Sequence, residues 1–330
     1  YEGGAARFTS VVNALRAAAE RRGGANAAGA VTVSSGDNFL AGPEITASLT
    51  KGSLPFYDSI FLSRVGYDAL AIGNHEFDFG PDILADVIEG ATGTGPWISA
   101  NLDVTGEPRL DDLRRRGRIA ASTVVDIDGR KVGIVGAATP RLSSISSPGR
   151  GTVGDVATAV RSEVASLRGR GVESIVLSSH LQSSEEDVAR AGYLDDVDIM
   201  IAGGGDELLA NPDALLQPSD AALAATARPY PVEARDAAGR TIPVVTTSGD
   251  LRYVGRLIAG FDANGNLVRV NEESGPVRVI GGTAADAAPA DPFVQANVTD
   301  PGEESKEALA LNRQAGTEVP HTAENFFTWA

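Results

Sequence analysis

One stretch, residues 69–80, constrains the fold of this chain more than any other. Its apolar beginning, 69–72, predicts a short buried strand that ends at Gly73. The residues that follow carry an amide, an imidazole and two carboxylates: Asn74, His75, Glu76 and Asp78. Open α/β sheets place their ligand sites at the carboxyl ends of buried parallel strands. The stretch therefore predicts a strand followed by a functional site, and a polar turn before a helix is the alternative.

Three other predicted strands lead to side chains of the same kind. They are 30–34 with Asp37, 173–177 with His180, and 197–202 with Asp206 and Glu207. The chain has only three histidines, and two of them follow such strands. Oxygen and imidazole ligands suit Mn, Zn, Fe or Mg rather than copper or a cluster. If one carboxylate bridges two ions about 3.5–4 Å apart, the pair can clamp a phosphorus centre for in-line displacement.

Strands and helices alternate along the chain to about residue 202, and hairpins follow. Helical spacing of apolar residues predicts helices at 5–22, 44–51, 54–65, 82–89, 153–167 and 184–191. Turn residues predict hairpins around Asp128-Gly129, at 236–240 and at 262–266. This order of elements predicts a mixed sheet covered by helices.

Composition argues against several classes of function. The chain has 28 Lys+Arg and 44 Asp+Glu, and its formal net charge of −16 argues against nucleic acid as the main partner. Cysteine is absent, which excludes thiolate nucleophiles, thiolate metal sites and disulfides. No apolar run approaches the roughly 18 residues of a membrane span. No glycine-rich loop of the P-loop type occurs, so metal ions rather than backbone amides are expected to hold phosphate.

Four motifs of the chain resemble, in order and type, those of the calcineurin-like metallophosphoesterases: Gly36-Asp37, Gly73-Asn-His-Glu-Phe-Asp78, Asn101 and His180. Within that family the chain most resembles the secreted 5′-nucleotidase group, which includes the UDP-sugar hydrolases. The likeness runs from about Gly3 to Gly282. It implies a four-layer α/β/β/α sandwich of two mixed sheets, the metallophosphoesterase fold. It also implies two divalent metal ions at the sheet ends, which we expect to be Mn, Zn, Mg or Ca.

The resemblance implies a role for each matching residue. Asp37 matches the carboxylate that bridges both ions, and Asn74 and His180 match ligands of the second ion. His75 matches the catalytic histidine, which stabilises the developing charge or protonates the leaving oxygen. Asp78 matches the acid that orients this ring, a pairing that fixes the tautomer of an imidazole and raises its basicity.

At the remaining positions, the chain either has a residue with an implied structural role or departs from the family pattern. Glu76 is implied to have a structural role. The family's first metal motif, Asp-x-His, is expected upstream of Tyr1, because Tyr1-Glu-Gly-Gly4 resembles the segment just after it. Gly205 stands where a second-metal histidine is expected, and it has no side chain that could coordinate an ion.

Two acids follow Gly205, and their role is open. Glu207 matches a ligand of the first ion, and Asp206 lies beside it. As ligands they would make the site harder and more negative, and would favour Mn, Mg or Ca. The alternative is that both acids cap a helix that starts near Leu208, because acids stabilise helix N-termini.

We predict a metallophosphoesterase domain at 1–282, and at 283–330 a linker with a short helix near 305–311. The last residues are either the start of a C-terminal nucleotide-binding domain or a tail. The predicted function is metal-dependent hydrolysis of nucleotides or related phosphomonoesters, in which a metal-bound hydroxide attacks phosphorus. The alternative is a non-catalytic binding or surface-assembly module that has lost metal ligands. The resemblance and the acidic composition predict a secreted, periplasmic or cell-surface protein.

Overall fold

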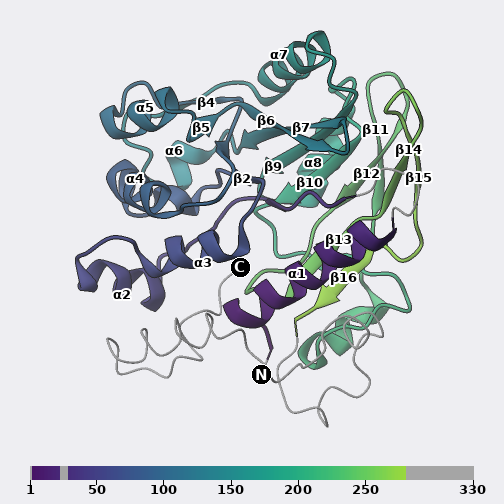
Figure 1. Cartoon of the computed structure of the whole chain (residues 1–330), viewed down its shortest axis with the longest axis horizontal. Helices are drawn as coiled ribbons and strands as arrows, with labels where there is room; N and C mark the ends of the chain where they lie inside the picture. The colour runs from purple at the N-terminus through teal and green to yellow at the C-terminus, as the bar shows by residue number, and fades with distance from the viewer. Residues whose placement is uncertain (1, 23–28, 280–330) are drawn as a thin grey trace.

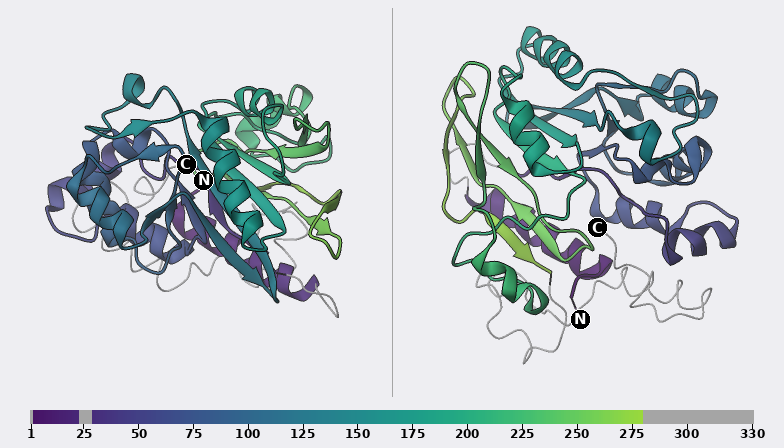
Figure 2. Two further views of the ribbon diagram at one scale, coloured as in Figure 1. Left: turned by 90° about the horizontal axis from the view of Figure 1, so that it is seen from above. Right: turned by 180° about the vertical axis from the view of Figure 1, so that it is seen from behind.

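The computed structural model describes residues 2–22 and 29–279. Within this part of the chain, two β-sheets carry helices on their outer faces (Figure 1). The long helices are α1 (Ala5–Arg22), α2 (Pro43–Lys51), α3 (Tyr57–Val65), α4 (Gly80–Gly90), α5 (Pro108–Arg115), α7 (Val156–Gly169) and α8 (Ser184–Ala191). Three short helices lie in connections: η1 (His75–Phe77), α6 (Leu142–Ile145) and η2 (Pro218–Ala225). Seen from behind, α8 lies in front of the strands, on the face opposite to the one that Figure 1 shows (Figure 2).

The smaller sheet has the order β1-β2-β3-β5, and the larger one has the order β11-β12-β10-β9-β7-β6. Strands of the smaller sheet are β1 (Val33–Ser34), β2 (Ala69–Ala71), β3 (Trp97–Ile98) and β5 (Ile119–Ala120). Strands of the larger sheet are β6 (Ser122–Ile127), β7 (Arg130–Ala138), β9 (Ser174–His180), β10 (Ile199–Gly203), β11 (Val232–Arg235) and β12 (Thr241–Val245). Three further pairs stand apart: β4 (Leu102–Asp103) with β8 (Thr152–Val153), β13 (Tyr253–Arg256) with β16 (Gly275–Arg278), and β14 (Ala259–Phe261) with β15 (Leu267–Val270).

The predicted α/β/β/α fold class is confirmed, with one difference in the sheets. Only the larger sheet is mixed, because β6 and β11 pair antiparallel at its edges. The smaller sheet contains parallel pairs alone within the described residues. Helices connect its successive strands, and such crossovers return the chain in the same direction. The predictions for 283–330, including the helix near 305–311, lie outside the described residues.

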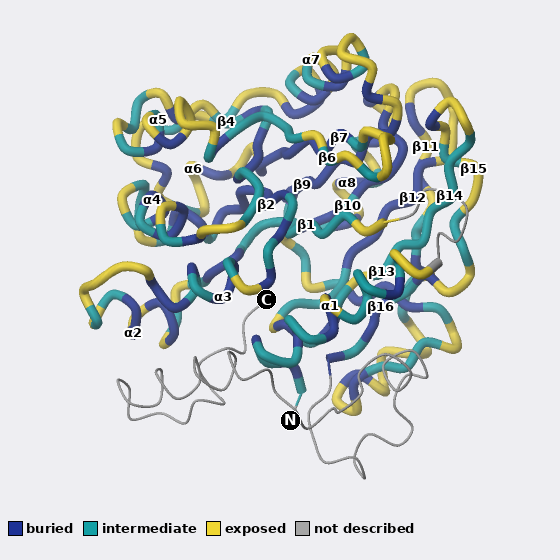
Figure 3. Tube along the Cα trace, in the orientation of Figure 1, coloured by how far each residue is buried: buried dark blue, intermediate teal, exposed yellow. Residues whose placement is uncertain are grey.

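The two sheets pack against each other through apolar side chains. Ala69, Ile98 and Ile134 form a core between them, against which Val33 and Val125 also pack. Figure 3 shows this buried interior between strands of the two sheets. A Cβ added at Gly136 would collide with the backbone at Ile98, so the chains of β7 and β3 touch there without a side chain between them. Parallel strands buried on both faces need apolar residues of this kind.

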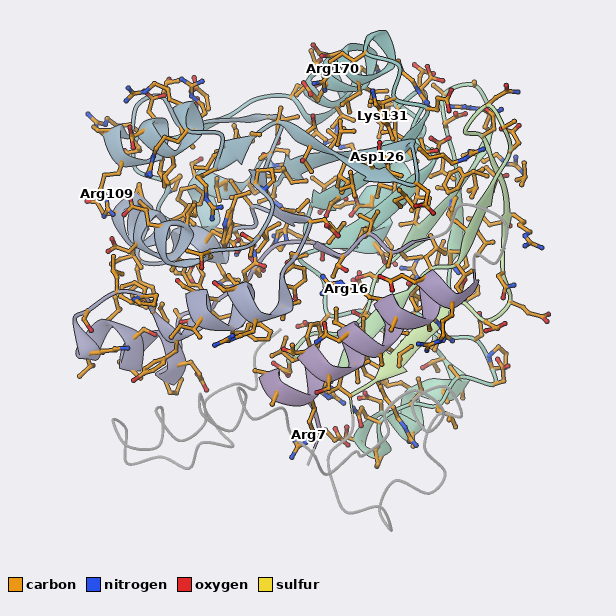
Figure 4. The ribbon with its side chains drawn as sticks, viewed as in Figure 1. Arg7, Arg16, Arg109, Asp126, Lys131 and Arg170 are labelled. Atoms are coloured by element: carbon orange, nitrogen blue, oxygen red, sulfur yellow. The ribbon has the colours of Figure 1, made fainter. Side chains whose placement is uncertain are left out.

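Helix α1 is tied to the smaller sheet by Arg16, which Figure 4 labels on that helix. Its guanidinium donates to Thr32 Oγ1 at 2.9 Å, just before β1. It also donates to the carbonyls of Val65 and Gly66 at 2.6 and 2.7 Å, at the end of α3. Arg16 thus satisfies the last carbonyls of one helix and fixes the start of the strand that leads to Asp37. Among the described residues, no helix is both long enough and apolar enough to cross a membrane.

Candidate metal centre

The loops that follow β1, β2, β9 and β10 meet at one place, although these strands belong to two sheets. Ser178 Oγ in β9 donates to the carbonyl of Ser34 in β1 at 3.4 Å. A Cβ added at Gly203, the last residue of β10, would collide with the carbonyl of Ser35. Because the strand ends approach so closely, polar side chains from separate sheets converge on one site.

Asp37 lies in a sharply turned loop after β1. Gly36 has φ +101° and Asp37 has φ +54°, so two successive residues adopt a left-handed backbone that is uncommon for aspartate. A Cβ added at Gly36 would collide with the His180 ring and would lie 2.9 Å from the amide nitrogen of Gly73. Glycine at position 36 therefore lets the His180 ring lie directly against the loop that carries Asp37.

Glu76 is fully buried and joins the loop after β1 to the loop after β2. Its Oε2 accepts hydrogen bonds from the backbone amides of Asp37 and Gly73 at 3.0 and 2.6 Å. Its Oε1 accepts from the backbone and side-chain nitrogens of Asn38 at 2.6 and 2.9 Å. Four donors replace the water that a carboxylate loses on burial. These contacts give Glu76 the structural role that the resemblance implies.

His180 is oriented by a backbone carbonyl. Its Nδ1 donates to Ser35 O at 2.7 Å, and since a carbonyl only accepts, the proton is assigned to Nδ1. Nε2 then faces two oxygens: Oδ2 of Asp37 at 3.0 Å and Oδ1 of Asn74 at 3.1 Å. A neutral imidazole would present a lone pair to two acceptors. The arrangement therefore requires either a protonated ring or a cation between these three atoms.

The charges of Asp37 and His180 stabilise each other. Burial raises the pKa of the Asp37 carboxyl, but hydrogen bonds from His180 and from the backbone amide of His75 outweigh it and lower that pKa. Burial lowers the pKa of His180, but the Asp37 carboxylate and the Ser35 carbonyl outweigh it and raise that pKa. Asp37 and His180 thus lie in direct contact, with Oδ2 and Nε2 3.0 Å apart, at the place where the sequence predicts a metal ion.

The distances from Nε2 of His180 to the two oxygens are compatible with ligands of one divalent ion. With ligands about 2.1 Å from an ion, neighbouring donors lie about 3.0 Å apart at right angles and about 3.4 Å apart at the tetrahedral angle. Nε2 of His180 lies 3.0 Å from Asp37 Oδ2 and 3.1 Å from Asn74 Oδ1, close to these values. The carbonyl behind Nδ1 of His180 is the partner that metal-binding histidines have in proteins.

His75 and Asp78 lie beside this group and form a pair of their own. His75 is in the short helix η1, which places Asp78 one turn later, and Nδ1 of His75 lies 2.6 Å from Asp78 Oδ2. The His75 side chain is 40% exposed and that of Asp78 is 14% exposed. Asp78 also accepts from Ser146 Oγ at 3.2 Å and from the backbone amide of Ala41 at 3.3 Å. The ring is therefore held from behind and open to solvent in front.

Asp206 and Glu207 are placed differently from the other predicted ligands. Glu207 Oε1 accepts from the backbone amide of Ser184, the first residue of α8, at 3.0 Å. A Cβ added at Gly205 would collide with the Glu207 carboxylate, which occupies the space of the missing side chain. Asp206 is exposed. Within the described ranges, no three His, Asp or Glu side chains are arranged to hold a metal ion, so a three-donor set has to include the Asn74 amide.

The expected helix near Leu208 is wrong. The chain is irregular from 204 to 217 apart from a bridge between Leu209 and Arg228. The physical reason is that Glu207 caps another helix, α8, which lies next to β10 in space but precedes it in sequence. Its carboxylate is therefore not available to stabilise the N-terminus of a helix that starts at position 208.

Two residues of the site gave no recognisable signal in the sequence. Gln182 Nε2 donates to Asn74 Oδ1 at 2.6 Å, and Ser146 Oγ donates to Asp78. Both are ordinary polar residues in loops, and only the folded chain shows their partners. Asn101, by contrast, belongs to the resemblance but bonds to the backbone at Ala138, with Nδ2 donating at 2.9 Å and Oδ1 accepting at 2.8 Å.

The fold has close counterparts among solved structures. A calcineurin-like phosphoesterase from Bacillus subtilis matches 91% of this chain and 89% of its own with a TM-score of 0.57 and 18% identity. The 5′-nucleotidase precursor from Thermus thermophilus matches 96% of this chain and 54% of its own, with a TM-score of 0.71 and 30% identity. The fold of this chain is therefore that of the calcineurin-like phosphoesterases.

Comparison of the sequence with curated proteins gives more specific relatives. An apyrase of Anopheles gambiae is 31% identical over 238 residues, which are 71% of this chain and 40% of the apyrase. The chain thus spans less than half the length of this curated relative, and about half of the Thermus nucleotidase. No family model matches the chain. In sequence and structure, the chain is thus similar to part of an apyrase and part of a 5′-nucleotidase.

Proposed function

We propose that the protein containing this chain is a metal-dependent phosphohydrolase that acts on nucleotides or related phosphomonoesters. The observation that carries the proposal is the convergence of Asp37, Asn74 and His180: Nε2 of His180 lies 3.0 Å from Oδ2 of Asp37 and 3.1 Å from Oδ1 of Asn74. Relatives named apyrase and 5′-nucleotidase support a nucleotide as the substrate. A divalent ion at this site would neutralise phosphate charge and supply an activated water.

The residues of the site would have two roles, which are metal binding and proton donation. Asp37 and Asn74 present oxygens and His180 presents Nε2, so the set accepts ions that favour mixed oxygen and nitrogen ligands, such as Mn or Zn. His75 is open to solvent, and Asp78 Oδ2, 2.6 Å from Nδ1 of His75, orients the ring. The other ring nitrogen of His75 can then donate to a phosphate oxygen or protonate the leaving oxygen.

Glu207 has the contacts of a helix cap, and we propose this role for it in place of a ligand. The acid next to it, Asp206, is exposed. The proposed site of this chain therefore holds one ion through Asp37, Asn74 and His180. Oδ1 of Asp37 accepts a hydrogen bond from the backbone amide of His75 at 2.9 Å. If the Asp37 carboxylate also bound a second ion, it would have to use a lone pair that this hydrogen bond leaves free.

The test uses metal and phosphate as separate readouts. The protein is stripped with EDTA, reloaded with Mn²⁺, and supplied with AMP and ADP as probes, and released inorganic phosphate is measured. We expect release that depends on Mn²⁺ and is lost in Asp37→Ala. Bound Mn²⁺ without phosphate release from the full-length protein would overturn the hydrolase.

The non-catalytic module is the second candidate, and one observation favours it. Gly205 leaves the site one side chain short, and the Glu207 carboxylate fills that space while bonded to α8. A module of this kind would keep the fold and lose the ion. Equilibrium dialysis against Mn²⁺ distinguishes the two, because the module binds none.

We also propose that the parent protein is exported. The net charge of −16 and the likeness to secreted nucleotidases support this. Cell fractionation is the test, and recovery of the parent protein in the cytoplasm would contradict the proposal.

A further inference from the structure

Gln182 has a backbone that its residue type rarely adopts. It follows His180 by two positions and has φ +87°, in the left-handed region that glycine favours. Such conformations are strained and persist only where the surroundings enforce them. A strained residue two positions from a candidate metal ligand therefore needs an explanation.

The surroundings of Gln182 are tight on the side of β10. Its backbone amide donates to the carbonyl of Gly203 at 3.3 Å. A Cβ added at Gly204 would lie 3.0 Å from both the amide nitrogen and the Cα of Gln182, and 2.9 Å from Nε2 of His180. The chain after β10 thus packs directly on the backbone of Gln182. This packing turns the Gln182 side chain toward the end of β2, where Asn74 lies.

The side chain makes a single directed contact there. Nε2 of Gln182 donates to Oδ1 of Asn74 at 2.6 Å. An N–H group can bond to the oxygen of the Asn74 amide but not to its NH₂ group. The contact therefore selects the amide rotation in which Oδ1, and not Nδ2, points toward Nε2 of His180. A carbonyl oxygen has two lone pairs, so Oδ1 can accept from Gln182 and bind an ion at the same time.

We propose that Gln182 is a positioning residue that holds the amide oxygen of Asn74 toward the divalent ion. This inference rests on the proposed metal-dependent function. Asn74 without such a partner can rotate its amide and present its NH₂ group, which repels a cation. Removal of a group that lies behind a metal ligand typically changes metal affinity by about 10–100-fold.

The experiment measures Mn²⁺ affinity by isothermal titration calorimetry on the whole 330-residue chain, with melting temperature of the EDTA-treated protein as a second readout. Gln182→Gly removes the amide and also relieves the left-handed strain. Gln182→Glu keeps the length of the side chain but replaces the N–H donor with oxygen. Asp128→Gly is the matched control, because Asp128 has φ +49° in the exposed β6–β7 turn, away from the site.

We expect Gln182→Gly and Gln182→Glu to weaken Mn²⁺ binding by about 10-fold or more. Gln182→Gly should not lower the melting temperature of the metal-free protein, and Asp128→Gly should leave Mn²⁺ affinity unchanged. Wild-type affinity in Gln182→Gly would overturn the inference. Tighter binding in Gln182→Glu would also overturn it, because Gln182 would then be a ligand itself.

The wild-type titration separates this inference from the function on which it rests. If the wild-type chain binds no Mn²⁺, the proposed function and the inference both fail. If it binds Mn²⁺ and the variants bind it equally well, the function stands and only the role of Gln182 fails.

Discussion

The carboxylate of Glu207 accepts a hydrogen bond from the backbone amide of Ser184 at 3.0 Å, across the gap between β10 and α8. Helix α8 already has a cap of its own, since Ser183 Oγ accepts from the amide of Glu186 at 3.2 Å. Glu207 therefore satisfies a second free amide at the same helix end and adds a negative charge where the helix dipole favours one. The acid that the resemblance assigns to a metal is engaged in local structure.

Glu207→Gln should lower the free energy of unfolding by about 0.3–1 kcal/mol, because it removes the charge at the α8 terminus. Its Mn²⁺ affinity should equal that of the wild type. Urea unfolding and calorimetric titration measure the two quantities. Asp206→Asn is the control, since it removes the same charge from the exposed neighbouring residue and should leave stability nearly unchanged. Weaker Mn²⁺ binding in Glu207→Gln alone would show that Glu207 is a ligand after all.

Asp37→Ala and His75→Ala should separate metal binding from turnover. Asp37→Ala removes the oxygen that lies 3.0 Å from Nε2 of His180, so both bound Mn²⁺ and phosphate release should be lost. His75→Ala should keep bound Mn²⁺ and lower kcat by about 10²–10⁴-fold, the usual range for a general acid. Metal content by mass spectrometry and kinetics with AMP check both. The assigned roles are wrong if His75→Ala empties the site as completely as Asp37→Ala.

Ser146→Ala should lower kcat by about 2–10-fold with KM unchanged, which is less than the full worth of a hydrogen bond to a carboxylate because Ser146 acts on the ring only through Asp78. Ser146 Oγ donates to Asp78 Oδ1, and the other carboxylate oxygen holds His75. Loss of this contact loosens the acid that orients the ring. Ser144→Ala is the matched control, because Ser144 Oγ bonds to the carbonyl of Arg141 on the same segment. Equal kinetics in the two variants would remove Ser146 from the site.

Asp187→Asn should change how stability depends on pH. Burial raises the pKa of Asp187 to about 7, against the hydrogen bond from Ser179. The folded pKa lies above the ordinary value of 3.8, so the folded state binds the proton more tightly than the unfolded state does. The carboxyl therefore costs the wild type stability progressively as pH rises from about 4 to about 7, by at most about 1.4 kcal/mol per pH unit.

The neutral amide in the Asp187→Asn variant has no such dependence. The variant should gain stability relative to the wild type between pH 5 and pH 8, as measured by urea unfolding of the metal-free proteins. The wild type itself serves as the reference at pH 5, where its Asp187 is largely protonated. A difference that stays constant over this range would contradict the raised pKa.

Local signals in the sequence were sufficient for much of the fold. Helix α8 spans Ser184–Ala191, the predicted range, because Ser183 caps it and acids fill its first turn. The β6–β7 hairpin turns at Asp128-Gly129, whose φ values of +49° and +83° suit the tight turn that this dipeptide favours. Both features depend on residues that are neighbours in the chain.

Features that join distant segments were not predictable in this way. The pairs β4–β8 and β13–β16 are strands of two to four residues, too short to show a periodic pattern. Convergence of Asp37, Asn74 and His180 could be expected from their positions after buried strands. The contacts of Gln182 with Asn74 and of Glu207 with Ser184 could not, because each depends on the packing of one loop on another.

The four hydrogen bonds to Glu76 also bear on how fast the site can exchange its ion. They bind the loop of Asp37 to that of Gly73 and Asn74 through protein contacts alone. If the proposed site binds an ion, its loss would leave the two loops in register, and a new ion would meet ligands that are already preorganised. Little conformational entropy would be lost in each rebinding event. The proposed site would then exchange its ion without passing through a locally unfolded state.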